Sequence, residues 1–279
     1  MPQAVQLIDL TPSSEHCSEI DALRRTIDWG PGSWFLGPMM EAGGRVLGAR
    51  GEDGALIAMG GGAVFPPSGF ICNMVVRPDQ KRRGLGRQIF EELIGWLRSS
   101  GFASIQLEAT AEGRPLYEQY GFHERWESVG STLVTPPGRG DESRIESAGA
   151  AGWDAVAELD LRATGMARGA LLRRLAAQRN FREAIILRSA AGVEGYGLRF
   201  DGRIGPLVAT TPSAAATLAR ALASRSEPGT IATVGHPRHA ELWASLGFDV
   251  SPFDLRMFSG PEPADDTGMI FCMLNGGAG

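Results

Sequence analysis

Residues 70–90 read FICNMVVRPDQKRRGLGRQIF, and this stretch decides the fold. It opens with an apolar, β-branched run at Phe70–Val76, which predicts a strand. Pro78 ends the pairing of that strand because proline has no N–H to donate. A helix is expected over Gln88–Ser100, since apolar residues recur at helical spacing from Leu85 onwards. A strand, a glycine turn and a helix start, in this order, form a ready-made site for an anion.

The turn between this strand and this helix is basic and contains glycine. Gly84 and Gly86 let backbone amides approach a ligand closely. Four cations belong to the same turn: Lys81, Arg82, Arg83 and Arg87. No Gly-Lys-Ser/Thr follows, so the turn is not a Walker loop, and Ile89 replaces the third glycine of the dinucleotide fingerprint. The residues therefore predict an anion site without identifying the anion.

The stretch resembles motif A of the GNAT acetyltransferases, whose consensus is Val-x-Pro followed by Gln/Arg-x-x-Gly-x-Gly/Ala. Val76–Pro78 and Lys81–Gly86 match this consensus, with lysine where Gln or Arg is usual. Lysine keeps the positive charge but loses the planar fork of arginine. The family's second motif ends in Tyr-x-x-x-Gly-Phe, and Tyr117–Phe122 matches it at the expected distance. The resemblance covers about residues 4–135, and these two motifs carry nearly all of it.

The second half of the chain repeats the pattern of the first half. Leu116–Phe122 matches Leu242–Phe248, and each follows a predicted hairpin, strand, helix and further strand. The Pro- and Gly-rich run Pro136–Asp141 is the predicted linker. The predicted domains are 1–138, a catalytic acetyl-CoA-binding GNAT domain, and 142–279, a degenerate GNAT-like domain that completes the acceptor site. The expected fold class is α/β (α+β): tandem GNAT folds, each a mixed, mostly antiparallel twisted sheet with a central splay, flanked by helices.

The second repeat lacks the features that would hold an anion. Thr210–Ala215 stands where the first half has Lys81–Arg87, and it contains neither Gly-x-Gly nor a basic residue. Trp243 stands where the first half has Tyr117. The second half is therefore expected to keep the fold and to bind no cofactor.

Periodicity and turn residues predict the remaining elements. Helices are expected at Ser14–Trp29, Trp153–Arg162, Arg168–Gln178, Pro212–Ser224 and His236–Leu246. Strands are expected at Ala4–Leu10, Arg45–Arg50, Ala55–Val64, Ser104–Glu108, Ser143–Ser147, Phe181–Ser189, Gly192–Asp201, Gly205–Ala209 and Thr230–Val234. The apolar segment Ser33–Met40 is ambiguous. Gly60–Gly62, inside a predicted strand, indicates a bulge or a close approach of another backbone.

Composition limits the classes of partner. The net charge of −5 disfavours a general nucleic-acid or anionic-membrane surface, so neither partner is expected. Three widely spaced cysteines, at positions 17, 72 and 272, disfavour a disulfide scaffold and a zinc cluster and fit a reducing cytoplasm. No secretory signal and no membrane span is expected. Arg is used almost to the exclusion of Lys, which together with abundant Ala and Gly indicates a bacterial source.

The resemblance implies transfer of an acetyl group from acetyl-CoA to a primary amine, by direct attack in a ternary complex and without a metal. Backbone amides and cations of the basic turn would hold the pyrophosphate, and free amides of the splayed strand would polarise the thioester. The cofactor-binding residues expected on this basis are Met74, Val75, Val76, Lys81, Arg82, Arg83, Gly84, Leu85, Gly86, Arg87 and Tyr117.

Tyr117 occupies the family's general-acid position and would protonate the departing thiolate, with packing in the core as the alternative. Glu108 is the candidate base, and it could equally bind the substrate cation or lie in a salt bridge. The expected substrate-binding residues are Trp29, Trp34, Phe35, Asn73 and Glu108. For the three aromatic residues, packing on the sheet is the alternative. Further polar candidates are Asp160, Arg162 and Arg256, with ordinary ion pairs as the alternative.

Other functions stay open at this stage. The chain could be a non-catalytic, CoA-binding regulatory protein, or an acyltransferase that uses a different acyl-CoA, such as succinyl-CoA. A small-molecule amine is the expected acceptor, while an amino acid, an aminoglycoside, a polyamine or a protein amine also fits. Oligomerisation is left open and is not predicted.

The loss of the basic turn from the second repeat generates a first prediction. Calorimetric titration with acetyl-CoA should give one site per chain, because only the first repeat offers amides and cations to a pyrophosphate. Two sites per chain would contradict the interpretation of the second half, and no binding would contradict the resemblance to an enzyme.

Overall fold

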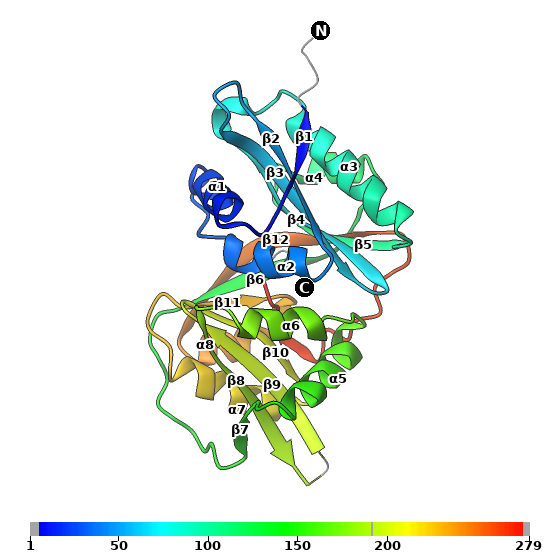
Figure 1. Ribbon diagram of the computed structural model, residues 1–279. Coiled ribbons are helices and arrows are strands. Elements are labelled where there is room, and N and C mark those ends of the chain that lie inside the picture. Colours follow the sequence, from blue (N-terminus) through cyan, green and yellow to red (C-terminus); the bar gives the residue numbers. More distant parts are fainter. Residues whose placement is uncertain (1–5, 191, 276–279) are drawn as a thin grey trace. The chain divides into compact units, whose positions relative to one another are not determined.

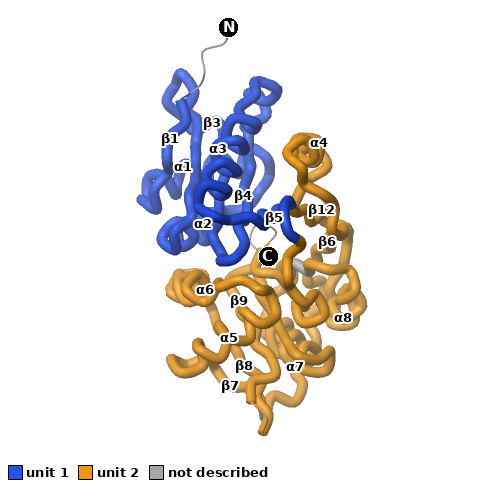
Figure 2. The backbone as a smooth tube through the Cα atoms, turned by 90° about the vertical axis from the view of Figure 1, so that its right-hand side faces the viewer, with its two compact units in different colours: residues 1–107, 259–261 blue, residues 108–258, 262–279 orange. Residues whose placement is uncertain are grey.

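The computed structural model describes residues 6–190 and 192–275 and divides the chain into two compact units. Unit 1 runs as far as Leu107 and adds Ser259–Pro261, while unit 2 contains Glu108–Phe258 and the residues from Glu262 onwards (Figure 2). The boundary between the units therefore falls inside a strand. The division at 138–142 concerns the two sequence repeats and stays a prediction.

The sheet of unit 1 has the strand order β1-β2-β3-β4-β5 (Figure 1). Its strands are β1 Leu7–Leu10, β2 Arg45–Arg50, β3 Leu56–Phe65, β4 Ser68–Val76 and β5 Ser104–Ala109. Neighbours pair antiparallel from β1 to β4, and β4 and β5 pair parallel. The mixed, mostly antiparallel sheet is thus confirmed. The first strand was predicted over Ala4–Leu10, and residues 4 and 5 of this range lie outside the described residues.

The helices of unit 1 are α1 Ser14–Arg25, α2 Ser33–Glu41 and α3 Leu85–Ser99, with a short 3₁₀ turn, η1 Pro78–Gln80. The ambiguous segment is therefore a helix. Its start is fixed by Asp21 of α1, whose Oδ1 accepts hydrogen bonds from Gly32 N at 2.8 Å and Ser33 N at 2.9 Å. A carboxylate at this place satisfies helix N–H groups that have no partner within the helix. The predicted helix to Trp29 was too long, because the chain turns at Asp28, which has φ +58°.

The glycine run in β3 lets helices pack close on both faces of the sheet. A Cβ at Gly62 would lie 2.6 Å from Trp96 of α3, and a Cβ at Gly61 would lie 3.4 Å from Leu36 of α2. The register with β4 also shifts between Met59 and Gly61. The run thus marks both of the features expected for it, a close approach and a bulge.

The sheet of unit 2 has the order β12-β6-β11-β10-β9-β8-β7, and β13 pairs with β10 (Figure 1). The strands are β6 His123–Leu133, β7 Ile145–Ser147, β8 Phe181–Ser189, β9 Gly192–Phe200, β10 Arg203–Ala209, β11 Ile231–Val234, β12 Phe248–Ser259 and β13 Ile270–Cys272. Among the described strand pairs of this unit, only β10 and β11 pair parallel. They correspond to β4 and β5, the parallel pair of unit 1. The sequence pattern predicted neither β12 nor β13.

Strand β6 belongs to the first half of the sequence but lies between two strands of the second half. It pairs antiparallel with β11 from Val129 to Thr132 and with β12 from His123 to Leu133. The two sequence repeats therefore share one sheet within unit 2, which a division of the chain at the linker would not suggest.

The helices of unit 2 are α4 Arg114–Glu118, α5 Gly152–Thr164, α6 Gly169–Ala176, α7 Pro212–Ala223 and α8 Ala240–Ser245, with a 3₁₀ turn, η2 Pro237–His239, before α8. The helix predicted from His236 is therefore split into two. Gly195 and Gly197 of β9 repeat the glycine spacing of β3, since a Cβ at either would lie 2.7 Å from a leucine of α7, Leu218 or Leu222.

A buried ion pair joins α5 to the start of α6. Both side chains, Asp160 and Arg168, are fully buried, and Arg168 donates to the two carboxylate oxygens at 2.7 and 3.1 Å. The Tyr196 hydroxyl of β9 donates to the same carboxylate. Asp160, a polar candidate from the sequence, thus forms the buried ion pair given as its alternative.

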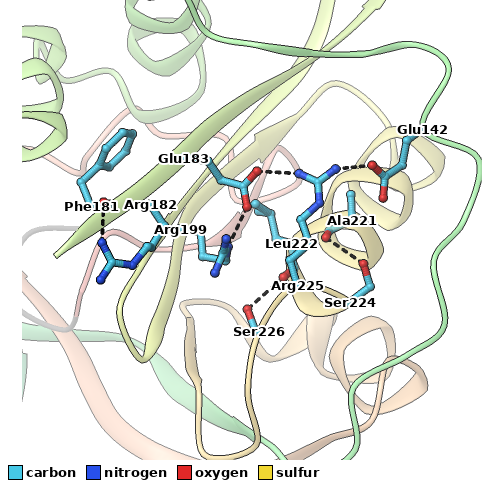
Figure 3. A network of polar contacts seen from close by, with 10 residues as sticks. All are labelled: Glu142, Phe181, Arg182, Glu183, Arg199, Ala221, Leu222, Ser224, Arg225 and Ser226. Atoms are coloured by element: carbon cyan, nitrogen blue, oxygen red, sulfur yellow. Dashed lines mark hydrogen bonds and ion pairs between the residues drawn. The ribbon is translucent and has the colours of Figure 1, made fainter.

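A second polar network links the segment after the predicted linker to the sheet. Arg225, just after α7, donates to Glu142 on one side and to Glu183 of β8 at 2.5 Å on the other, and Arg199 of β9 donates to the second oxygen of Glu183 at 2.7 Å (Figure 3). These side chains are only about a fifth exposed. The network holds residue 142 against unit 2.

The buried ion pair predicts a large effect on stability. Arg168→Met should lower the free energy of unfolding by about 3–5 kcal/mol, because it leaves the Asp160 carboxylate buried without its cation. Arg173→Met is the matched control. It breaks an α6 pair with Asp154 whose side chains are 42% and 86% exposed, so it should change stability by less than about 1 kcal/mol. Equal urea midpoints for the two variants would contradict this interpretation.

Candidate functional site

Strand β4 changes its pairing halfway along its length. Its parallel register with β5 runs from Ser68–Ser104 to Ile71–Leu107. Beyond that point β4 continues against β3, where Val75 and Val76 lie opposite Met59 and Ala58. The predicted splay is thus confirmed. It places the amides near Val75 and Val76 beyond the paired part of the β4–β5 ladder.

The basic turn leads into an uncapped helix. Gly84, with φ +83°, is the N-cap residue of α3, and no side chain caps this helix. Lys81–Gly84 is exposed, and Arg82 also lies in the left-handed region, with φ +61°. Left-handed residues in such a turn direct successive N–H groups toward one concave side, where they can bind an anion. The first N–H groups of α3 have no acceptor within the helix.

The turn is held by its own side chains. Arg77 Nε lies 2.7 Å from Asp79 Oδ1, and Gln80 donates to the other carboxylate oxygen at 2.9 Å. Arg83 donates to the side-chain oxygen of Gln80. The hydrogen bond from Arg77 lowers the pKa of Asp79. These exposed contacts link Arg77, Asp79, Gln80 and Arg83 along the turn.

The matching helix of the second repeat begins differently. The Thr211 hydroxyl accepts a hydrogen bond from Ala214 N at 3.1 Å, and Pro212 occupies the first turn of α7. A threonine cap satisfies one N–H group, and proline has none to offer. The start of α7 is therefore capped by a side chain of the protein, whereas among the described residues no side chain caps the start of α3.

Asn73 lies at the bulge of β4 and is held by a residue that the sequence did not single out. Its φ is +52°, an uncommon value for a residue other than glycine. Arg24 of α1 donates to its side-chain oxygen, to Gly30 O at 2.7 Å, and lies 5.0 Å from the centre of the Trp29 ring. The structure thus brings Asn73 and Trp29 together through Arg24.

The other two aromatic candidates lie on α2. Phe35 is 2% exposed and belongs to the core of unit 1, while Trp34 is half-buried with its ring 6.0 Å from that of Phe35. Core packing, the alternative given for these residues, describes Phe35. A substrate-binding role for Trp29 and Trp34 stays a prediction.

Glu108 is locked into a buried ion pair within unit 2. Arg256 Nε of β12 donates to one carboxylate oxygen at 2.5 Å, and Ser128 Oγ of β6 donates to the other at 2.9 Å. Both charged side chains are 3% exposed. Burial raises the pKa of Glu108, and Arg256 and Ser128 oppose that rise. This geometry matches the salt-bridge alternative for Glu108 and for Arg256, and the role of Glu108 as a base stays a prediction.

Tyr117 lies in α4 and is 6% exposed. Its hydroxyl lies beside Gly113, where an added Cβ would come within 3.1 Å of the oxygen. Burial, and secondly the charge of Asp254, raise the pKa of Tyr117, so the phenol keeps its proton at neutral pH. Trp243, its counterpart in the second repeat, is fully buried and donates its indole N–H to Phe271 O at 2.8 Å. Trp243 therefore has a structural role.

Asp254 of β12 is the charged residue that the sequence analysis missed. Burial, and then the charge of Glu108, raise the pKa of its carboxyl to about 6. Such a shift, beside a tyrosine and a second carboxylate, is typical of functional sites. A signal was present in Phe253–Phe258, where apolar and charged residues alternate as on a half-buried strand.

The candidate residues fall into two groups, one in each unit. The basic turn, Asn73 and the aromatic candidates belong to unit 1. Glu108, Tyr117 and Asp254 belong to unit 2. There the charge of Glu108 raises the pKa of Asp254, and the charge of Asp254 raises the pKa of Tyr117. Strand β5 carries the chain from the first group to the second, since Leu107 ends unit 1 and Glu108 begins unit 2.

Within residues 6–190 and 192–275, no three His, Cys, Asp or Glu side chains are grouped so that they could hold a metal ion. In the same part of the chain, every helix is too short or too polar to span a bilayer.

The chain matches two models of acetyltransferase families. Residues 7–122 match the acetyltransferase (GNAT) family, and residues 156–272 match an acetyltransferase (GNAT) domain. An uncharacterised N-acetyltransferase of Bacillus subtilis, YitH, is 29% identical over 192 residues, which is 65% of each chain. The chain thus spans just under two thirds of that relative. The ribosomal protein bS18-alanine N-acetyltransferase of Escherichia coli is 42% identical over 57 residues, 19% of this chain and 38% of its own length.

Solved structures share the fold at low sequence identity. A crystal structure from Pyrococcus horikoshii, assigned as an acetyltransferase, has a TM-score of 0.84 at 21% identity and covers 100% of this chain and 97% of its own. A tandem GNAT protein of the clavulanic acid pathway has a TM-score of 0.61 at 16% identity, with 94% and 100% covered. With a GNAT match on each half, this chain belongs to the GNAT acetyltransferase family and is built from tandem GNAT folds.

Proposed function

We propose that the chain transfers an acetyl group from acetyl-CoA to a primary amine by direct attack in a ternary complex. The uncapped start of α3 carries this proposal, because it follows a basic turn and a strand that has left its neighbour. In the second repeat, Thr211 caps α7, the helix equivalent to α3. This difference supports a single cofactor site, in the first repeat.

The basic turn would hold the pyrophosphate of the cofactor. When bound, acetyl-CoA supplies an activated thioester and this negatively charged group. The N–H groups of Arg82–Arg87 and the positive end of the α3 dipole would face the phosphates. No atom lies within 4 Å of a Cβ placed on Gly84, so the backbone is open to a phosphate oxygen there. Amides near Val75 and Val76 would donate to the thioester carbonyl.

Tyr117 would donate its proton to the departing thiolate. The raised pKa keeps the phenol protonated at neutral pH, which a general acid requires before the reaction. The low exposure of Tyr117 would strengthen a hydrogen bond from its hydroxyl to the sulfur.

The proposed acceptor is a small-molecule amine. The net charge of −5 favours a cationic partner over an anionic one. The Escherichia coli relative acts on an alanine of ribosomal protein bS18, but its match covers only 19% of this chain, so its acceptor is not carried over. The free cysteines 17, 72 and 272 fit a reducing compartment, and we place the reaction in the cytoplasm.

The cofactor turn generates one prediction. Gly84→Val should lower acetyl-CoA affinity at least about tenfold, because a branched side chain would cover the amides and strain the left-handed backbone. Gly54→Val is the matched control, since Gly54 has φ +78° and equally open surroundings in a distant turn of unit 1. Calorimetry should show normal binding for the Gly54 variant. Equal losses in both variants would indicate general strain.

The proposed acid generates another prediction. Tyr117→Phe should lower kcat by roughly 100-fold or more and leave the acetyl-CoA Kd unchanged, because only the proton donor is removed. Tyr120→Phe, two residues after α4, is the control and should keep kcat. The measurement is release of the CoA thiol across an amine panel. Equal losses in kcat and cofactor affinity would show that Tyr117 is structural.

A further inference from the structure

Asp254 lies in a bulge of β12 beside the groups assigned to catalysis. Pro252 pairs with Val129 of β6 and Leu255 pairs with Glu127, so two residues of β12, Phe253 and Asp254, stand opposite one residue, Ser128. Bulges of this kind redirect side chains and occur often next to active sites. Ser128 is the residue that donates to Glu108.

The neighbours of Asp254 leave its carboxylate available. Arg256, two residues further along β12, is paired with Glu108. Among the residues that the structure describes, no side-chain cation or hydrogen-bond donor contacts the Asp254 carboxylate. Asp254 is only partly buried, whereas the Glu108 side chain is 3% exposed and each of its two oxygens accepts a hydrogen bond. Asp254 can therefore accept a donor from solution, whereas the Glu108 side chain is buried and already paired with Arg256.

The charged groups around Asp254 come from three neighbouring elements. Glu108 of β5 raises the pKa of Asp254, in addition to the larger effect of burial, to about 6. Asp254 in turn raises the pKa of Tyr117 of α4. Glu127 of β6 is exposed, opposite Leu255. At neutral pH the Asp254 carboxylate can therefore still take a proton, while the Tyr117 phenol still holds one to give.

We infer that Asp254 binds the ammonium of the acceptor and takes the proton that this nitrogen must lose before it attacks. The inference rests on the proposed acetyl transfer and names a residue, from the half without a cofactor turn, that acts in it. Arg256 and Ser128 hold Glu108 in place, and the negative charge of Glu108 would make Asp254 a stronger base.

The ammonium gives one proton to the Asp254 carboxylate, and the free amine forms the N–C bond as the C–S bond breaks. The nitrogen then loses a second proton, while the CoA sulfur gains one from Tyr117. Tyr117 recovers that second proton, and Asp254 releases the first to solvent. The net reaction converts acetyl-CoA and an ammonium into an amide, free CoA and one proton.

The first test is the pH profile of kcat/KM, with spermidine, lysine and glucosamine as probe amines. The wild-type profile should contain an ascending limb near pH 6 as Asp254 ionises. Asp254→Asn should remove this limb and lower kcat/KM about 100-fold or more, with acetyl-CoA affinity unchanged. Asp249→Asn, at an exposed position of the same strand, should behave as wild type.

A stability measurement separates this role from a structural one. The pKa of Asp254 is higher in the fold than its ordinary value of 3.8, so the ionised carboxylate opposes folding at pH above 6. This cost develops as the pH rises from about 4 to about 6 and is absent below about pH 4. Asp254→Asn should therefore raise the Tm at pH 8 and leave it unchanged near pH 3.5. A residue retained for structure would lose stability on substitution.

Several outcomes would overturn the inference. An active Asp254→Asn enzyme that keeps the limb near pH 6 would remove Asp254 from the proton path while leaving the proposed acetyl transfer intact. A lower Tm for Asp254→Asn at pH 8 would show a structural residue. A wild-type chain that binds acetyl-CoA but acetylates no amine in the panel would overturn the proposed function and the role of Asp254 with it.

Discussion

The parallel pairing of β4 with β5 stops at Ile71 and Leu107, and the proposed cofactor site depends on that divergence. Backbone N–H groups must find partners, and a strand that leaves its neighbour has amides to offer to a ligand. The bulge at Asn73 lets β4 continue against β3, and Arg24 holds that bulge from α1. The uncapped start of α3 follows on the same strand–turn–helix path.

The position of β6 makes the second repeat a structural partner of the first. β6, which contains Ser128, lies between β11 and β12 of the second repeat. The second repeat also supplies Arg256, which lies in β12. The Arg256–Glu108 pair spans 148 residues of sequence. Removing one partner of a buried ion pair is strongly destabilising. The stability of each repeat therefore depends on the other through this ion pair as well as through the shared sheet.

The two repeats share the packing of a helix against strand glycines, and they differ at the start of that helix and at the position of Tyr117. Paired glycines in β3 and β9 admit helices α3 and α7 at similarly short distances. The helix starts differ, since Thr211 caps α7 and no side chain caps α3. Tyr117 and Trp243 occupy matching places, but the indole donates to a backbone carbonyl in the core. The same packing thus constrains both copies, whereas the proposed anion site would constrain only the first.

The sequence by itself determined the local features: the strand, basic turn and helix at residues 70–90, the repeat, and most strands and helices, because these depend on periodicity and turn residues. Only the tertiary structure decided which strands of the two repeats pair, since local patterns carry no information on long-range pairing. It also decided that Glu108 is locked by Arg256 and that Asp254 lies beside Tyr117. Burial and charge coupling arise from residues far apart in the chain, and they set the protonation of a site that the residue types only suggest.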